Sequence, residues 1–144
     1  MKVFCDTSVL VASALQAHEH YSRAVAAVRA VQQGKDRGFI AAHSLLETYA
    51  VLTRLPVSPR IHPPMAKCII DDNFAANFEV IGLEPKEYSE LITRLAAKGI
   101  VGGTAYDLLL LACAAKAEVD CILTFNVRHF RMIADDMQDK IAAP

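Results

Sequence analysis

The sequence predicts one α/β domain, residues 1–144, built on a mainly parallel β-sheet of about five strands. Short runs rich in β-branched and aromatic residues alternate with longer segments of helical periodicity, which is the typical pattern of parallel sheets. The length of 144 residues fits one domain, and a hydrophobic content of 53% excludes a disordered chain. We therefore expect one sheet with helices on its faces.

The first half of the chain is expected to contain two strands and four helices. Apolar residues at Val3–Cys5 and Phe39–Ala42 indicate buried strands. Helices are expected where apolar residues recur every three or four positions, and Gly34 ends the second of them. Four prolines within residues 55–64 interrupt this pattern and predict an ordered loop. The four helices cover Val9–Gln16, His20–Gln33, Ser44–Arg54 and Met65–Phe74.

The second half is expected to contain three strands and two helices. Pro85 begins a helix that continues to Lys98, because proline suits the first helical turn. A glycine-rich turn then leads to the strongly apolar helix Ala105–Ala117. We assign no helix or strand to residues 126–139. The strands are Glu79–Ile81, Cys121–Phe125 and, at one edge of the sheet, Lys140–Ala142.

Charge and cysteine content narrow the classes of function. Fifteen basic and sixteen acidic residues give a net charge of −1, which excludes binding of nucleic acid by bulk charge but not by a local basic patch. The four cysteines form no CxxC pair and no closely spaced Cys/His set, so we expect buried, reduced thiols and no structural zinc. With neither an apolar leader nor an 18-residue uncharged segment, the sequence predicts a cytoplasmic protein without membrane contact.

Polar side chains lie where the predicted strands end. Asp6 directly follows the first strand, and Asn126 directly follows the strand Cys121–Phe125. Glu47 and Asp107 lie in the first turns of two helices that start at the same edge of the sheet. Because parallel sheets bind ligands in the crevice at the carboxyl ends of their strands, we expect these side chains to face that crevice.

Each acid also fits a structural role. Asp6 precedes a helix and is a suitable N-cap residue. Ser44 with Glu47, and Thr104 with Asp107, fit the capping-box pattern, in which the acid bonds back to the start of its own helix. The sequence leaves these capping roles and a shared site open as alternatives.

A shared site would have a defined chemistry. Three carboxylates about 4 Å apart repel one another by roughly 4 kcal/mol per pair at an effective dielectric constant of about 20. Such a cluster needs a cation or a bound proton, and a ligand set made only of oxygen suits Mg²⁺ or Mn²⁺. A hard cation that is open to water on one side supports hydrolysis of phosphodiesters.

Four segments around these residues resemble the PIN-domain ribonucleases, and most of all the VapC-type toxins of toxin–antitoxin pairs. They occur in the family's order and together span about residues 1–131. The resemblance implies a three-layer α/β/α sandwich, Mg²⁺- or Mn²⁺-dependent endonucleolytic cleavage of RNA, and a cognate antitoxin as partner. The segments are Phe4–Leu10, Ser44–Tyr49, Gly103–Asp107 with the apolar helix after it, and Ile122–Phe130.

The resemblance also implies roles for individual residues. Asp6, Glu47 and Asp107 match the acids that hold the cation and support catalysis, and Ser8 matches a hydroxyl position near them. Asn126 stands where many members carry a fourth acid. An amide can bind a metal through its oxygen but brings no charge, which weakens the expectation of a second metal ion.

RNA contacts are expected beside these acids. Arg128 and Arg131 flank the predicted site and are the expected phosphate contacts, together with Ser8. His129 has two interpretations, either a solvated loop residue or a contact to phosphate or water. His18 and His20 have no further metal ligands near them in the sequence and are interpreted as surface residues.

Two further expectations concern partners and alternatives. The apolar faces of the helices His20–Gln33 and Ser44–Arg54 exceed what one small core needs, which predicts a homodimer or a groove for an antitoxin peptide. Asn126 motivates the alternative function, a PIN-fold module that binds RNA or a partner without cutting. A phosphatase of the haloacid dehalogenase type with Asp6 as nucleophile is disfavoured, because Ser8 stands where that chemistry needs an aspartate.

Overall fold

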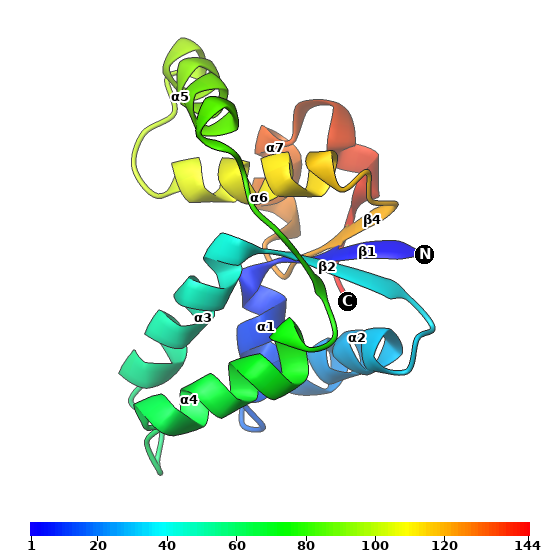
Figure 1. The fold of residues 1–144 in the computed structure, drawn as a ribbon, viewed down its shortest axis with the longest axis vertical. Helices are drawn as coiled ribbons and strands as arrows, with labels where there is room; N and C mark the ends of the chain where they lie inside the picture. Colours follow the sequence, from blue (N-terminus) through cyan, green and yellow to red (C-terminus); the bar gives the residue numbers. More distant parts are fainter.

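A five-stranded sheet runs through the middle of the molecule and separates two layers of helices (Figure 1). In this computed structural model, which describes residues 1–144, all neighbouring strands are parallel, in the order β3-β2-β1-β4-β5. The predicted three-layer α/β/α sandwich is therefore confirmed. The strands are β1 (Lys2–Cys5), β2 (Arg37–Ala41), β3 (Glu79–Ile81), β4 (Cys121–Leu123) and β5 (Ile141–Ala142).

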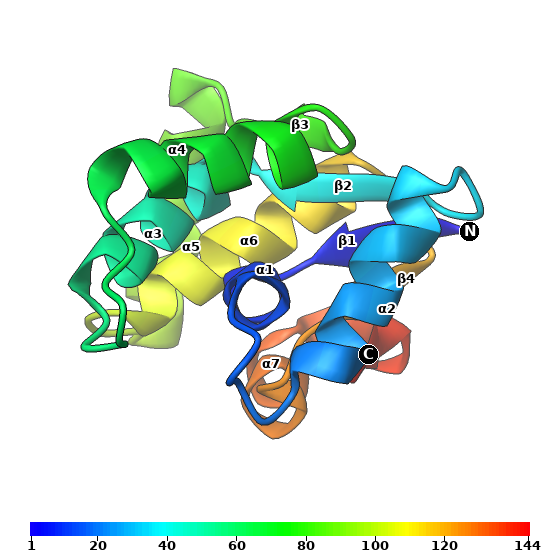
Figure 2. The same cartoon turned by 90° about the horizontal axis from the view of Figure 1, so that it is seen from below.

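Seven α-helices connect the strands and cover the sheet. The first four lie on one side of the sheet and the last three on the other (Figure 1; Figure 2). A π-helical segment, η1 (Asp71–Ala75), continues the fourth helix, and a 3₁₀ segment, η2 (Asp135–Lys140), precedes β5. The helices are α1 (Thr7–Ala14), α2 (Tyr21–Gln32), α3 (Ala42–Arg54), α4 (Pro63–Ile70), α5 (Pro85–Lys98), α6 (Thr104–Lys116) and α7 (Val127–Ile133).

The side chains of the central strands alternate between two hydrophobic cores. Val3 and Cys5 of β1 and Ile40 of β2 lie in the core shared with α1, α2 and η1. Phe4 of β1 and Phe39 of β2 lie in the opposite core, with α5, α6 and α7. Successive side chains of a strand point to opposite faces, so an uninterrupted apolar run serves both cores.

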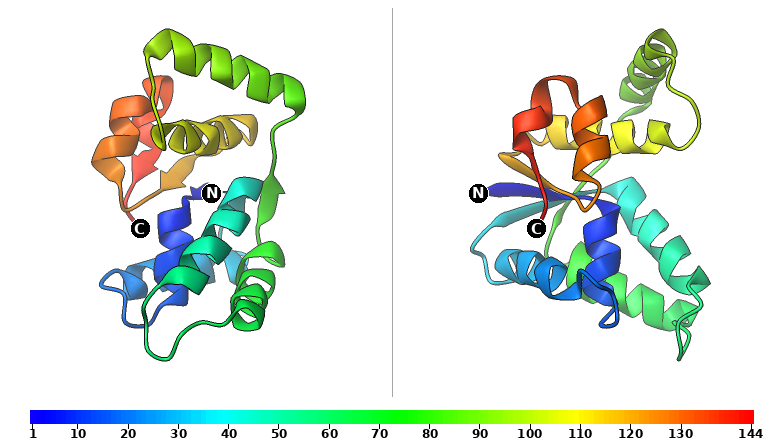
Figure 3. Two further views of the ribbon diagram at one scale, coloured as in Figure 1. Left: turned by 90° about the vertical axis from the view of Figure 1, so that its left-hand side faces the viewer. Right: turned by 180° about the vertical axis from the view of Figure 1, so that it is seen from behind.

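The helix α5 stands out from the body of the molecule (Figure 3). It begins with a capping box, in which the backbone N–H of Glu84 donates to Oε2 of Glu87 (2.6 Å). It ends at Gly99, whose φ of 66° is left-handed. Leu91 is its only buried residue, so α5 is held by a narrow apolar strip.

The sequence prediction missed three helical features, one of which is the 3₁₀ segment η2. The helix α7 forms where no element was assigned, because Val127, Phe130 and Ile133 recur at helical spacing and pack into the core with α5 and α6. The predicted helix Met65–Phe74 is divided between α4 and the π-helical η1. The other predicted boundaries differ from the observed ones by at most two residues.

The chain changes direction at β1, which occupies the centre of the sheet. It adds β2 and β3 on one side of β1, and later β4 and β5 on the other. Such a reversal leaves a crevice at the carboxyl ends of the two central strands, where ligands of open α/β sheets bind. Asp6 and Thr124, which directly follow β1 and β4, lie at this crevice.

Candidate active site

Asp6 is a buried carboxylate at the end of β1, with 4% of its surface exposed. Its backbone N–H donates to the carbonyl oxygen of Leu123 at the end of β4 (2.9 Å). Its Oδ2 accepts hydrogen bonds from the hydroxyls of Ser8 (2.6 Å) and Thr124 (2.8 Å). These bonds fix the carboxylate between the two central strands.

The surroundings of Asp6 disfavour its negative charge. Burial raises the pKa of the Asp6 carboxyl, because the ionised form loses its hydration. The hydrogen bonds from Ser8 and Thr124 oppose this effect by lowering the pKa, whereas the negative charge of Asp107 raises it further. Asp107 is therefore close enough to interact with Asp6, and a cation beside this pair would stabilise both charges.

Asp107 lies in the first turn of α6, and its side chain is 31% exposed. Its Oδ2 is 2.9 Å from Nε2 of His129 on α7. The structure thus places His129 directly against one of the predicted acids. With a protonated imidazole the contact is an ion pair.

Glu47, on α3, is connected to the end of β1 by a hydroxyl. Its Oε2 is 3.4 Å from Oγ1 of Thr7, the residue after Asp6, and the same Oγ1 is 2.9 Å from Oγ of Ser44. Oε2 is also 3.1 Å from Nε2 of His43, one helical turn earlier. Glu47 and His43 thus form a second pair of a carboxylate and an imidazole.

Two parallel rings link α3 to α6. The rings of His43 and Tyr106 have centroids 5.0 Å apart and planes inclined by 7°. Tyr106 directly precedes Asp107, and Tyr106 is 56% exposed. The stack therefore places the Glu47–His43 pair next to the helix that carries Asp107.

The capping roles are met for only one of the three acids. Asp6 occupies the N-cap position of α1, and the backbone N–H of Ser8, in the first turn of that helix, contributes to lowering the pKa of its carboxyl. The helix α3 begins at Ala42, two residues before Ser44, and α6 begins after Gly103, which places Thr104 inside the helix. The capping boxes predicted for Glu47 and Asp107 are therefore wrong, which leaves these two carboxylates available for a site.

The expected convergence of all three carboxylates is not met. No group of three His, Cys, Asp or Glu side chains has an arrangement that could hold a metal ion. Asp107 and Glu47 instead each contact a histidine. The pair of Asp6 and Asp107 nevertheless fits a hard cation, because it combines oxygen donors with a buried charge that needs to be offset.

The remaining predicted residues are divided between the site and the scaffold. The hydroxyl of Ser8 bonds to the buried acid and accepts a hydrogen bond from the backbone N–H of Phe125 (3.2 Å). Arg128 is exposed in the first turn of α7. Arg131 donates from Nε (3.3 Å) and Nη2 (2.8 Å) to the carbonyl oxygen of Ile141. Arg131 thus holds β5, which favours a structural role over contact with RNA.

Asn126 is tied to the site through its backbone. Its N–H donates to Oγ1 of Thr124 (3.0 Å), the hydroxyl that bonds to Asp6. The residue is exposed at the N-cap position of α7, and its side chain does not cap that helix. The amide is therefore available to a ligand at the edge of the crevice.

Comparison with models of known protein families identifies the family of this chain. The family model of the PIN domain matches residues 2–128 of the chain. The chain belongs to the PIN domain family. Ribonuclease VapC40 from Mycobacterium tuberculosis is 38% identical to it over 123 residues, which cover 85% of each protein. Ribonuclease VapC27 from the same organism is 34% identical over 111 residues, which cover 77% of this PIN domain and 75% of VapC27.

Solved structures share the fold of this PIN domain. VapBC2 from Rickettsia felis, bound to a DNA fragment from their promoter, matches with a TM-score of 0.62 and 20% identity over 92% of this chain and 93% of that chain. M. tuberculosis VapC20, described as a Sarcin-Ricin loop cleaving toxin, has a TM-score of 0.69 and 15% identity, covering 91% and 95%. The predicted resemblance to VapC-type PIN domains is thereby confirmed. None of the helices is both long enough and apolar enough to cross a membrane.

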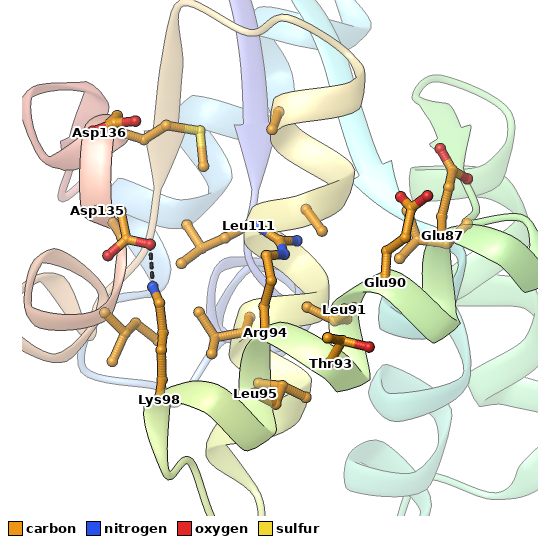
Figure 4. A pocket seen from close by; sticks show the side chains of 17 residues that line it. Glu87, Glu90, Leu91, Thr93, Arg94, Leu95, Lys98, Leu111, Asp135 and Asp136 are labelled. Carbon is orange, nitrogen blue, oxygen red and sulfur yellow. Dashed lines mark hydrogen bonds and ion pairs between the residues drawn. The ribbon is translucent and has the colours of Figure 1, made fainter.

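A cavity of this PIN domain, lined by both apolar and charged side chains, includes none of Asp6, Glu47 and Asp107 (Figure 4). It has a volume of about 670 Å³ between α5, α6 and η2, with Leu91, Leu95 and Leu111 in its wall. Lys98 and Asp135 form an ion pair at this cavity. None of the predicted site residues lines it, so the candidate active site is the polar crevice and not this cavity.

Sequence reasoning missed the roles of Thr124 and Thr7 in the PIN site, and it left open whether His43 approaches that site or only ends a strand. Thr124 was counted as part of a strand, although a hydroxyl at the end of an apolar run indicates a strand end. Thr7 follows Asp6 and reaches Glu47, which no local pattern indicates. The spacing of His43 and Glu47 is a recognisable helical pair once the helix is known to begin before Ser44.

Proposed function

We propose that this PIN domain is a Mg²⁺- or Mn²⁺-dependent endoribonuclease and the toxin of a toxin–antitoxin pair. The observation that carries the proposal is the Asp6 carboxylate, which is buried at the crevice between β1 and β4 and whose pKa is raised by that burial and further by the negative charge of Asp107. Two neighbouring carboxylates in such a place are costly unless a cation or a proton offsets their charge. The two relatives that are named ribonucleases support the same function.

The proposed cofactor follows from the donor atoms. Asp6 and Asp107 would hold the cation through carboxylate oxygens, the donors that Mg²⁺ and Mn²⁺ prefer. Glu47 would either complete the donor set or position the attacking water. When bound, such a cation supplies Lewis acidity toward the phosphate and promotes ionisation of water at neutral pH.

The residues of the chain orient this chemistry. Ser8 and Thr124 donate hydrogen bonds that hold Asp6 in one orientation and favour its ionised form. Glu47 is 41% exposed and lies 3.1 Å from His43, so its carboxylate is accessible to water and can accept a proton from it. In this proposal Asp6, which is hydrogen-bonded, binds the cation, and Glu47, which is exposed, accepts a proton from water.

RNA is proposed to bind across the start of α7. Arg128 supplies an exposed positive charge for phosphate, and His129 adds a second contact beside Asp107. Asn126, at the N-cap position, would orient a water through its amide. With the three predicted acids assigned to the site, fifteen basic residues face thirteen other acidic ones. Binding would therefore depend on a few local cations and show a shallow dependence on salt concentration.

The proposed partners are an antitoxin and a second copy of the chain. The solved VapBC2 complex from R. felis supports an antitoxin as partner. Large apolar side chains are exposed next to the acids in sequence, with Leu46 70% and Tyr106 56% exposed, and Val101 before α6 is 82% exposed. Exposed apolar surface of this kind is suited to a protein partner. Location in the cytoplasm remains a prediction.

The alternative function is a PIN domain that binds RNA or a partner without cutting it. Asn126 in place of an acid favours it, as does the absence of a cluster of three metal-binding groups. The two functions differ in whether a metal ion binds through carboxylates. Titration of Mn²⁺ into the purified protein separates them, because the binding module would show no carboxylate-dependent site.

The test of the nuclease is cleavage of RNA by the purified protein with Mg²⁺ or Mn²⁺, and again with EDTA. Asp6→Asn and Asp107→Asn are expected to abolish cleavage, while circular dichroism shows an intact fold. The control is Asp72→Asn, an exposed acid of η1. Full activity in either site variant refutes the mechanism, and undiminished cleavage in EDTA refutes the metal dependence.

A further inference from the structure

Four side chains form an aromatic and cationic cluster near the acids. The rings of His20 and Phe125 are stacked, with centroids 4.3 Å apart and planes inclined by 15°. The ring of His18 is 5.7 Å from that of His20, and the guanidinium of Arg23 lies over the Phe125 ring, 5.6 Å from its centroid. We call these four residues the ring cluster. It joins the loop between α1 and α2 to the segment between β4 and α7 (Figure 2).

The loop between α1 and α2 holds the histidine rings in place. The backbone N–H of His18 donates to the carbonyl oxygen of Leu15 (2.9 Å), and the N–H of Tyr21 donates to that of His18 (3.0 Å). Nδ1 of His18 accepts a hydrogen bond from the backbone N–H of His20 (3.1 Å). A neutral His18 therefore carries its ring proton on Nε2, which leaves a hydrogen-bond donor on the ring.

Two hydrogen bonds join the ring cluster to the active-site carboxylate. The backbone N–H of Phe125 donates to Oγ of Ser8 (3.2 Å), and Oγ of Ser8 donates to Oδ2 of Asp6 (2.6 Å). No group of metal-binding side chains forms at the cluster. Its chemistry is therefore that of flat rings and a planar cation.

We propose that the ring cluster binds an unpaired nucleobase of the RNA, next to the phosphodiester that is cleaved. This inference rests on the proposed function, since it assigns one more contact to the same substrate. Bases of single-stranded RNA stack on the planes of Phe, His and Arg side chains. The side chain of His20 remains 34% exposed, so the stack of His20 on Phe125 can accept another ring. The guanidinium of Arg23 adds a positive charge, which attracts the π-electrons of an aromatic ring.

A purely structural role leads to a different expectation. If the rings only fastened the loop to the segment before α7, their removal would lower the melting temperature and leave RNA binding unchanged. A base that stacks on the cluster instead makes affinity depend on that base being present and unpaired. The binding of RNA therefore distinguishes the two roles.

The experiment measures binding of a fluorescent single-stranded RNA of eight adenosines to the purified protein in EDTA, by fluorescence anisotropy. His20→Ala and Phe125→Leu are each expected to weaken binding about fivefold or more, the factor that corresponds to the loss of one stacked base. The controls are His62→Ala and Arg29→Ala, which change exposed residues outside the cluster and should leave binding unchanged. The same RNA paired with oligouridine should bind more weakly.

A second series replaces one adenine at a time by an abasic residue. An abasic residue at one position should weaken binding to the unmodified protein. The same abasic RNA should bind Phe125→Leu no more weakly than the intact RNA does, because the abasic residue and the substitution remove the same contact. Unchanged binding by His20→Ala and Phe125→Leu overturns the proposal, as does the lack of any base-sensitive position or of any binding. Mg²⁺-dependent cleavage of RNA by the unmodified protein decides the proposed function separately.

Discussion

Oγ1 of Thr124 donates a hydrogen bond of 2.8 Å to Oδ2 of Asp6. This bond joins the residues that directly follow the central strands β1 and β4. The same Oγ1 accepts a hydrogen bond from the backbone N–H of Asn126 (3.0 Å). Both Asp6 and Thr124 are buried. One hydroxyl therefore sets both the orientation of the carboxylate and the start of α7.

Replacement of this hydroxyl should weaken both the fold and the site. Thr124→Val keeps the shape of the side chain but leaves Asp6 with one donor fewer and the Asn126 N–H without its acceptor. We expect the free energy of unfolding to fall by about 1–3 kcal/mol and cleavage of RNA to slow, as measured by urea denaturation and by a cleavage assay. Thr93→Val, at an exposed position of α5, should change stability by less than about 0.5 kcal/mol. Equal stability of the two variants would contradict the role of the bond.

The raised pKa of Asp6 predicts how stability depends on pH in the metal-free protein. A carboxyl whose pKa is raised by folding favours the folded state in its protonated form. That contribution is complete below the ordinary value of 3.8 and is lost as the pH rises through the raised pKa. Asp6→Asn carries no such charge, so in EDTA it should melt above the unmodified protein at pH 7, with a difference that narrows toward pH 4. A difference that stays constant with pH would refute this account.

Several elements could be predicted because their signals are local. The strand Glu79–Ile81 and the helix Pro85–Lys98 are observed with the predicted boundaries. Pro85 suits a first helical turn, and Gly99 adopts the left-handed conformation that ends the helix, so neither depends on distant contacts. Asp6 was located for a similar reason, since a polar residue after a buried apolar run marks the edge of a parallel sheet.

The details of the site could not be predicted because they depend on contacts between distant segments. Ser44 fits a capping box, yet it lies inside α3, fully buried and hydrogen-bonded to Thr7. His20 was interpreted as a surface residue, yet its ring stacks on Phe125 from the other half of the chain. Spacing along the sequence contains no information about such pairs. The same limit explains why the pairing of Asp107 with His129 was not foreseen.

The close packing around β2 predicts an effect of one methyl group. A Cβ atom at Gly38 would lie 2.5 Å from a ring carbon of Phe78 and 2.5 Å from Cγ1 of Val31, both of which are buried. Gly38→Ala should therefore lower the free energy of unfolding by about 1–3 kcal/mol. Gly82→Ala is the control, because nothing lies within 4 Å of its Cβ position. Denaturation in urea measures both, and a Gly38→Ala variant as stable as the control would contradict the packing.

The different surroundings of Asp107 and Glu47 predict unequal roles in metal binding. The negative charge of Asp107 raises the pKa of Asp6, whereas the carboxylate of Glu47 contacts Thr7 and His43. Mn²⁺ at about 100 times its dissociation constant should stabilise the unmodified protein by about 2.7 kcal/mol, seen as a higher melting temperature. Asp107→Asn should lose most of this shift, and Glu47→Gln should keep more of it while slowing cleavage.

The control for this titration is Asp136→Asn, which changes an exposed acid of η2 and should keep the full shift. An equal loss in Asp107→Asn and Glu47→Gln would instead mean that Glu47 binds the ion as directly as Asp107 does. In that case Oε1 of Glu47 is the oxygen that could bind the ion without loss of the existing contacts, since Oε2 contacts His43 and Thr7. The comparison of the two variants thus assigns Glu47 either to the metal or to the attacking water.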